Sequence, residues 1–266
     1  MPTADLQREV EARRAQAARL EQERLDLQIE IEAFRLAYLS HAGAAQAELQ
    51  ALEIHIAEYQ LRNELMRLRG KSLSASQLEA EVDWQMRRRR EEFTAYQDSV
   101  FRAERETSQP PPTPDPATQN DLKSLYRDLA KRAHPDLATD DAERASRGAL
   151  MVEINEAYRR SDLTALKAIF ARWSVSGGEV PDDRERLREE IARLDGLISK
   201  IRAEIADLNR SDWMTMKLEA ALARARGIDW FQLARRQTEM RAAERRAELD
   251  DLIVEFMDRV RSAGLA

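Results

Sequence analysis

Residues 187–208 read LREEIARLDGLISKIRAEIADL, and their apolar side chains recur at alternating steps of four and three residues. The positions that carry this repeat are Leu187, Ile191, Leu194, Ile198, Ile201, Ile205 and Leu208. A spacing that averages about 3.5 residues places them in one stripe along a helix and is typical of a coiled-coil seam. Because a single apolar stripe needs a partner helix to cover it, the stretch predicts an all-α fold of long, paired helices.

The same repeat runs through the N-terminal segment 1–108, where Arg13 and Arg24 interrupt it. It pauses at 40–43, and we expect a helix break there. A turn near 70–74, which contains Gly and Ser, would let the next helix fold back on the one before it. The segment therefore predicts coiled-coil helices or helical hairpins.

The C-terminal segment 183–266 predicts further coiled-coil helices. We expect helix breaks near 209–212 and 227–229, since Gly227 suits a helix C-terminus and Asp229 suits the N-cap of the next helix. The seams of these helices can close within one chain or between two chains in a homodimer, and the pattern leaves both arrangements open.

The composition excludes several classes of protein. The 266-residue chain has no cysteine and three histidines far apart in sequence, so we expect no metal site and no cofactor. Its eight glycines form no phosphate or dinucleotide loop, and no nucleophile motif is present, so we do not expect an enzyme. The chain has no apolar run of membrane-spanning length and no signal-like start, which predicts a cytoplasmic protein without a membrane partner.

Nucleic-acid binding is not expected either. The formal net charge of the chain is −6, which gives no general attraction to phosphate. The four consecutive arginines at 87–90 would point around a helix rather than along one face, and Glu91 and Glu92 follow them. This cluster is therefore interpreted as a solvated helix surface.

Two linkers isolate a small middle segment. The proline-rich stretch 109–118 cannot be crossed by a helix, because proline lacks the amide donor and restricts the residue before it. Residues 174–182 contain two glycines and a proline and predict a second linker. The segment 119–173 between them is predicted to be a separate, small helical domain.

The middle segment begins with an amphipathic helix over 121–133. One face of this helix is apolar, with Leu122, Leu125, Leu129 and Ala133. Another face is basic, with Lys123, Arg127 and Lys131 at steps of four residues. Residues at this spacing lie above one another on a helix, so the three cations form a stripe that can steer an acidic partner.

The tripeptide His134-Pro135-Asp136 follows this helix. Pro135 disfavours the helical conformation for His134, so the helix is predicted to end there. We expect an exposed loop, followed by another helix from about Asp141. An imidazole, a rigid ring and a carboxylate beside a basic stripe make a poor catalytic site but a good docking site for another protein.

Three motifs in this order resemble the J-domain of DnaJ-type co-chaperones. They are Leu125-Tyr126-Arg127-Asp128-Leu129-Ala130, His134-Pro135-Asp136 and Asn155-Glu156-Ala157-Tyr158. The resemblance covers about 120–172, and the layout resembles bacterial J-domain proteins whose domain lies between coiled-coil segments. We therefore expect an all-α chain in which long coiled-coil helices or helical hairpins flank a small J-domain-like helical domain.

The resemblance implies that the partner is a DnaK-type ATP-dependent chaperone. In the family, the His-Pro-Asp turn and the basic face before it dock on that chaperone, stimulate its ATP hydrolysis and so trap a client protein. By matching position, the trigger would be His134, Pro135 and Asp136, and the docking helix would use Lys123, Arg127 and Lys131. The coiled-coil helices would choose the client, whose identity the sequence does not reveal.

The short opening helix of the family has no counterpart here, because prolines occupy its place. Either the end of the helix over 75–106 fills the vacant groove, through Phe101, or the core is smaller. The missing helix also motivates an alternative function. In that reading, the chain is a coiled-coil scaffold or adaptor whose J-like domain docks proteins without stimulating ATP hydrolysis.

Overall fold

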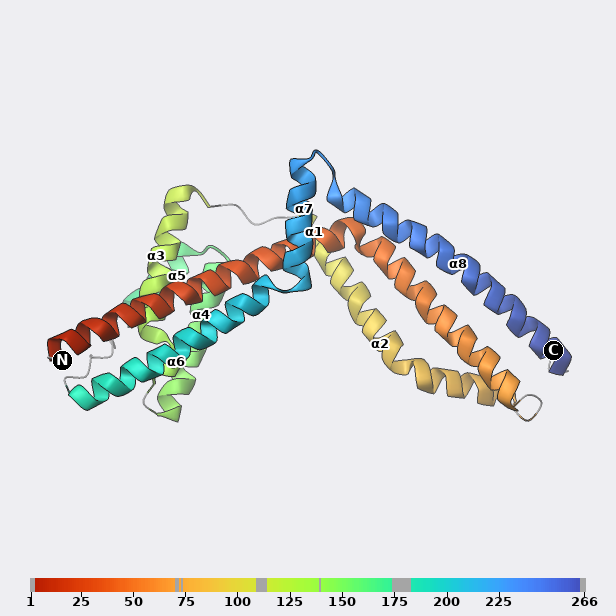
Figure 1. Ribbon diagram of the computed structural model, residues 1–266, viewed down its shortest axis with the longest axis horizontal. Coiled ribbons are helices and arrows are strands. Elements are labelled where there is room, and N and C mark those ends of the chain that lie inside the picture. Colours follow the sequence, from red (N-terminus) through yellow and green to blue (C-terminus); the bar gives the residue numbers. More distant parts are fainter. Residues whose placement is uncertain are drawn as a thin grey trace. The chain divides into compact units, whose positions relative to one another are not determined.

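A computed structural model describes residues 3–69, 72, 74–108, 114–138, 140–173 and 183–263 (Figure 1). Its helices are α1 (Thr3–Arg69), α2 (Ala75–Ser108), α3 (Pro116–Ala133), the 3₁₀ turn η2 (Pro135–Leu137), α4 (Asp141–Arg159), α5 (Leu163–Trp173), α6 (Arg184–Asn209), α7 (Asp212–Ala225) and α8 (Trp230–Ala263). No strand occurs in these ranges. The prediction of an all-α fold is confirmed.

The chain folds into two compact units that do not follow the order of the sequence. The first unit combines Met1–Ala33 with Pro111–Thr215, and the second combines Phe34–Pro110 with Met216–Ala266. The helix α1 contributes its first part to one unit and its second part to the other. Each unit is thus built from segments that the sequence suggested as separate blocks.

The predicted helix break at 40–43 was wrong, since α1 continues through these residues. Gly43 lies so close to α2 that a Cβ atom added to it would stand 2.9 Å from a methyl group of Val100. Glycine weakens a helix by roughly 1 kcal/mol relative to alanine. Here, however, its missing side chain is what lets α2 approach, so the residue serves packing and not a break.

The helix α3 begins earlier than the sequence suggested. Asp115 is its N-cap, and the carboxylate of Asp115 accepts hydrogen bonds from the backbone N–H groups of Ala117 and Thr118 at 3.0 and 3.1 Å. Pro116 stands at the first helical position, where proline costs no hydrogen bond. The predicted linker 109–118 therefore ends in helix, while its residues 109–113 and the linker 174–182 lie outside the described residues.

The helices α3, α4 and α5 of the first unit enclose one apolar core. Its fully buried members include Tyr126, Leu129, Ile154 and Leu166. The hydroxyl group of Tyr126 donates a hydrogen bond to the side-chain oxygen of Asn155 at 2.9 Å, which joins α3 to α4. The apolar face of α3 and the start of α4 agree with the helices that the sequence predicted.

The helix α1, and not α2, completes this core. Ala18 and Leu25 are buried in the same apolar cluster as α3, α4 and α5, and Ile29 packs against it. Phe101 on α2 is 63% exposed and belongs to the second unit, so the expectation that it fills the groove was wrong. The core of the small helical domain is thus completed by a segment that begins more than 80 residues earlier in the chain.

The apolar seam of α6 is covered by α1 within the same chain. The two helices run side by side in the first unit. In Figure 1 they start at the red N-terminal end of α1 and at the teal end of α6. Residues early in α1 meet residues early in α6, so the pair is parallel. The shared clusters join Leu6 and Val10 to Leu187 and Leu194, and Ala17 to Leu197, Ile198, Ile201 and Ile205.

The second unit packs α2 and α8 against the second part of α1. Met66 of α1 shares an apolar cluster with Leu78 and Val82 near the start of α2, which makes α1 and α2 antiparallel. Further along, Leu49, Leu52 and Ile56 cluster with Ala242 and Leu249 of α8. The predicted breaks near 209–212 and 227–229 coincide with the ends of α6, α7 and α8.

Candidate partner-docking site

The turn after α3 has a backbone fixed by its own residues. As predicted, α3 ends at Ala133, and His134 adopts an extended conformation with φ −63° and ψ 130°. Its imidazole Nδ1 accepts a hydrogen bond from the backbone N–H of Asp136 at 3.1 Å. The backbone N–H of Leu137 donates to the carbonyl oxygen of His134 at 3.1 Å. Pro135 and these two bonds fix the backbone of the turn and the orientation of the imidazole.

The second nitrogen of His134 points to α1. Its Nε2 lies 3.1 Å from a carboxylate oxygen of Glu21. Since Nδ1 already accepts a hydrogen bond, a neutral ring carries its proton on Nε2 and donates it to Glu21. His134 is 8% exposed and Glu21 is 4% exposed, so this contact is shielded from water.

The carboxylate of Glu21 is held in its charged form. Burial alone would raise its pKa, but the hydrogen bond with His134 and the charge of Arg24 outweigh that effect and lower the pKa below its ordinary value. Arg24 lies 2.7 Å from the second oxygen of Glu21. The imidazole of the turn therefore faces a negative charge on the same chain.

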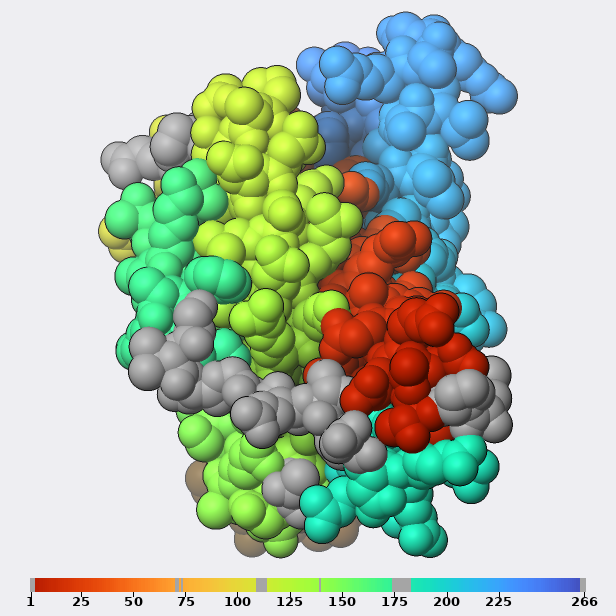
Figure 2. Space-filling view, turned by 90° about the vertical axis from the view of Figure 1, so that its left-hand side faces the viewer, coloured from red at the N-terminus to blue at the C-terminus, as the bar shows by residue number. Residues whose placement is uncertain are grey.

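The predicted exposure of this turn was wrong. Pro135, Asp136 and Leu137 are half-buried, and η2 lies against α6. Leu137 packs against the apolar cluster that α1 and α6 share. Figure 2 shows the red N-terminal part of α1 between the yellow-green α3 and the teal start of α6. Two helices far away in sequence thus cover a turn that local sequence alone would leave in solvent.

The basic stripe of α3 also meets acidic residues of α1. Lys131 forms an ion pair with Glu11, and the ammonium group of Lys123 lies 3.6 Å from a carboxylate oxygen of Asp26. Burial tends to raise the pKa of Glu11, but the hydrogen bond and charge of Lys131 lower it overall. Two of the three predicted docking cations are therefore paired within the chain.

Asp136 and Arg127 differ from the other docking candidates. Arg127 is exposed, and its Nε donates a hydrogen bond to the backbone carbonyl of Lys123 at 3.2 Å. Within the described ranges, neither the carboxylate of Asp136 nor the guanidinium group of Arg127 forms an ion pair. One acidic and one basic group of the site thus have no charged partner in the part of the chain that the structure describes.

The tyrosine of the third motif packs in the core of the first unit and also makes a polar contact. The rings of Tyr158 and Tyr126 lie 4.6 Å apart between centroids. The hydroxyl group of Tyr158 donates to the carboxylate of Asp26 at 2.8 Å. Burial and this hydrogen bond raise the pKa of Tyr158, so the hydroxyl group keeps its proton and remains a donor.

Sequence reasoning missed two kinds of residue at this site. The acidic residues of α1 that meet α3 and the turn, Glu11, Glu21 and Asp26, carry no local signal because they lie in a helix with many similar charges. Arg147 of α4 is also buried, and its guanidinium group donates to the backbone carbonyl of Arg132 at 2.8 Å. That contact satisfies a carbonyl at the end of α3 and fixes the base of the turn.

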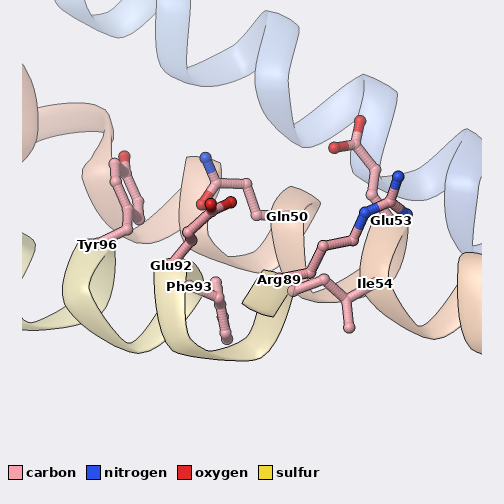
Figure 3. Close-up of a pocket in the computed structure, with 7 residues that line it drawn as sticks. All are labelled: Gln50, Glu53, Ile54, Arg89, Glu92, Phe93 and Tyr96. Atoms are coloured by element: carbon pink, nitrogen blue, oxygen red, sulfur yellow. The ribbon is translucent and has the colours of Figure 1, made fainter. Parts of the chain in front are cut away.

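The second unit contains a pocket lined by charged, polar and apolar side chains. A pocket of about 460 Å³ lies between α1 and α2 in the second unit (Figure 3). Gln50, Glu53 and Ile54 extend into it from α1, and Arg89, Glu92, Phe93 and Tyr96 extend from α2. Burial raises the pKa of Tyr96 to about 12. A phenol with this pKa stays protonated near neutral pH and makes a poor general base.

The arginines at 87–90 spread around α2 as the sequence predicted. Arg88 pairs with Glu92 at 2.9 Å, whereas Arg90 pairs with Glu58 of α1 at 2.5 Å. Arg89 lines the pocket between the two helices. No continuous basic face results from these directions.

Comparisons with known proteins add no relative. No protein-family model, curated protein or solved structure matches the chain. Among the described helices, none has an apolar stretch long enough to cross a membrane.

Proposed function

We propose that the chain is a J-domain-type co-chaperone that docks on a DnaK-type chaperone through His134, Pro135 and Asp136. The observation that carries the proposal is the turn at the end of the α3–α4 hairpin. Its backbone is fixed by the imidazole of His134, and the carboxylate of Asp136 forms no ion pair with the described residues. These features suit a rigid recognition corner.

In this proposal, Asp136 accepts a charge-assisted hydrogen bond from a cationic side chain of the chaperone. Arg127 and the neighbouring lysines of α3 speed the encounter with an acidic surface. Docking stimulates hydrolysis of the ATP that the chaperone holds, so the chain itself needs no catalytic residue or cofactor. The long helices around the small domain would select the client, in the cytoplasm, where we expect the chaperone to act.

A second function is favoured by one specific observation. His134 is buried against Glu21, and two docking lysines are paired with α1. A scaffold that uses its J-like domain only to brace long helices would show the same contacts. In that case the chain would bind a stable partner without any effect on ATP hydrolysis.

Single-turnover ATP hydrolysis by a DnaK-type chaperone separates the two functions. The full chain and its variant E11Q/E21Q/D26N, which removes the acidic contacts to α3, are each compared with the same proteins that also carry D136N. The co-chaperone reading predicts that at least one parent protein accelerates hydrolysis and that D136N abolishes the acceleration. If neither parent accelerates hydrolysis at a large molar excess, the scaffold is the better description.

Circular dichroism and solution mass serve as controls in this assay. Asp136 is half-buried and forms no ion pair within the described residues, so D136N should leave the helical content and the mass unchanged. A loss of stimulation with an unchanged fold then reports on docking alone. The mass also shows whether the full chain is a monomer or a homodimer.

A further inference from the structure

We infer that α1 competes with the chaperone for the docking residues of α3 and of the turn. An acidic surface of α1 occupies the place of the chaperone until α1 is displaced. This inference rests on the proposed function, since it concerns access to the same site. We call the three residues Glu11, Glu21 and Asp26 the acidic cover.

Charge complementarity is the first argument for the acidic cover. Each of its carboxylates meets a different candidate docking residue, as Glu11 pairs with Lys131, Glu21 with His134 and Asp26 with Lys123. An acidic partner protein would need the same groups. Two occupants cannot use one set of donors, so binding of the partner and closure of α1 exclude one another.

Apolar contacts also hold the turn against α1 and α6. Leu137, the residue after the docking tripeptide, packs on the cluster formed by Leu6 and Val10 of α1 with Leu187 and Leu194 of α6. The helix α6 also lies against η2. The turn is therefore held from two sides, and displacement of α1 alone would leave α6 in its way.

Ion pairs between α1 and α6 indicate that the two helices move together. Arg13 lies 2.7 Å from Asp195, Arg14 lies 2.5 Å from Glu190, and Arg24 lies 2.6 Å from Glu204. Two of these arginines are the residues that interrupt the heptad repeat of α1. The helix thus presents its arginines to α6 and its acidic cover to α3, so that opening of the turn moves α1 together with α6 and separates Ala18 and Leu25 from the core of α3, α4 and α5.

The test uses the full chain and two triple variants with the same change of charge. E11Q/E21Q/D26N neutralises the acidic cover. D5N/E9Q/E23Q is the matched control, because the ion pairs of Asp5 and Glu9 among the described residues are with neighbours on α1, and Glu23 is exposed. Two readouts apply: the concentration that gives half-maximal stimulation of ATP hydrolysis by a DnaK-type chaperone, and hydrogen exchange of peptides that contain residues 134–138 without the chaperone.

Neutralising the acidic cover should lower the half-maximal concentration by about tenfold or more, because apparent affinity scales with the fraction of open molecules. The control should match the wild type within about twofold. Hydrogen exchange at 134–138 should rise in the first variant alone. Circular dichroism confirms that both variants keep their helical content.

Other outcomes separate the cover from the proposed function. Equal stimulation by the wild type and both variants would overturn the cover and leave the co-chaperone function standing. If no protein stimulates hydrolysis although exchange at 134–138 rises, the turn opens but the proposed function fails. If no protein stimulates hydrolysis and exchange at 134–138 does not rise either, the acidic residues hold nothing closed, and both proposals are overturned.

Discussion

Replacing Glu21 with alanine removes the acceptor of the His134 imidazole and one partner of Arg24. Glu21 and His134 are 4% and 8% exposed, so water reaches the abandoned donor poorly. A buried donor that loses its acceptor costs about 1–3 kcal/mol. We expect E21A to lower the free energy of unfolding by about 2–3 kcal/mol.

A double-mutant cycle isolates the pair from the rest of the site. E21A, H134A and the double variant are unfolded with urea, and the transitions are followed by far-ultraviolet circular dichroism. A hydrogen bond with a charged partner contributes about 1.5–3 kcal/mol, and Arg24 remains to stabilise the carboxylate in H134A. We therefore expect a coupling energy of about 1–2 kcal/mol.

The matched pair for this cycle is Arg88 with Glu92, an exposed ion pair on α2 in the second unit. Exposed pairs of this kind contribute about 0.2–1 kcal/mol, so its coupling should be clearly smaller. A coupling between Glu21 and His134 no larger than that of the exposed pair would show that this buried contact does not hold the turn on α1. The interpretation that the contact between Glu21 and His134 covers the docking turn would then be refuted.

Three further predictions concern the core, the helix contact and pH. L25A should lower the free energy of unfolding by about 2–5 kcal/mol, because Leu25 is 1% exposed in the core of the first unit; no loss in urea unfolding would mean that α1 does not complete that core. G43A should destabilise the second unit by about 1–3 kcal/mol through its contact with Val100, and V100A should relieve the loss in thermal unfolding. Because the folded-state pKa of Glu21 is lowered, its contribution to stability is present above the ordinary value of 4.5 and declines as pH falls through the lower folded value. E21Q should therefore weaken the loss of unfolding free energy at acidic pH. An unchanged dependence of stability on pH would contradict the assignment of this pKa to Glu21.

The heptad repeat of α6 predicted a covered seam but not the helix that covers it. A spacing of about 3.5 residues places apolar side chains in one stripe and carries no information about the partner. The structure covers the stripe with the first part of α1 in the same chain. Arg13 and Arg24, which looked like faults in the repeat, face Asp195 and Glu204 across this contact. Polar interruptions can therefore mark where a particular neighbour lies.

Local rules predicted the turn itself well and its surroundings poorly. Pro135 ends α3 at Ala133 as expected, since the ring restricts the residue before it. Burial of His134 depends on Glu21, which lies 113 residues away in sequence. Nothing in residues 121–158 signals that contact. The break expected at 40–43 failed for a related reason, because the glycine there serves a distant helix through Val100.

The most direct test of the docking claim is a binding measurement. A DnaK-type chaperone is immobilised in the presence of ATP, and the full chain carrying E11Q/E21Q/D26N, which neutralises the acidic cover, is added in solution. We predict saturable binding that falls at least tenfold when D136N is added to the same chain and that is unchanged when D128N is added instead. Asp128 is exposed on α3, a matched carboxylate outside the turn. Equal binding by the parent chain and by its D136N derivative would contradict the assignment of His134, Pro135 and Asp136 as the docking corner.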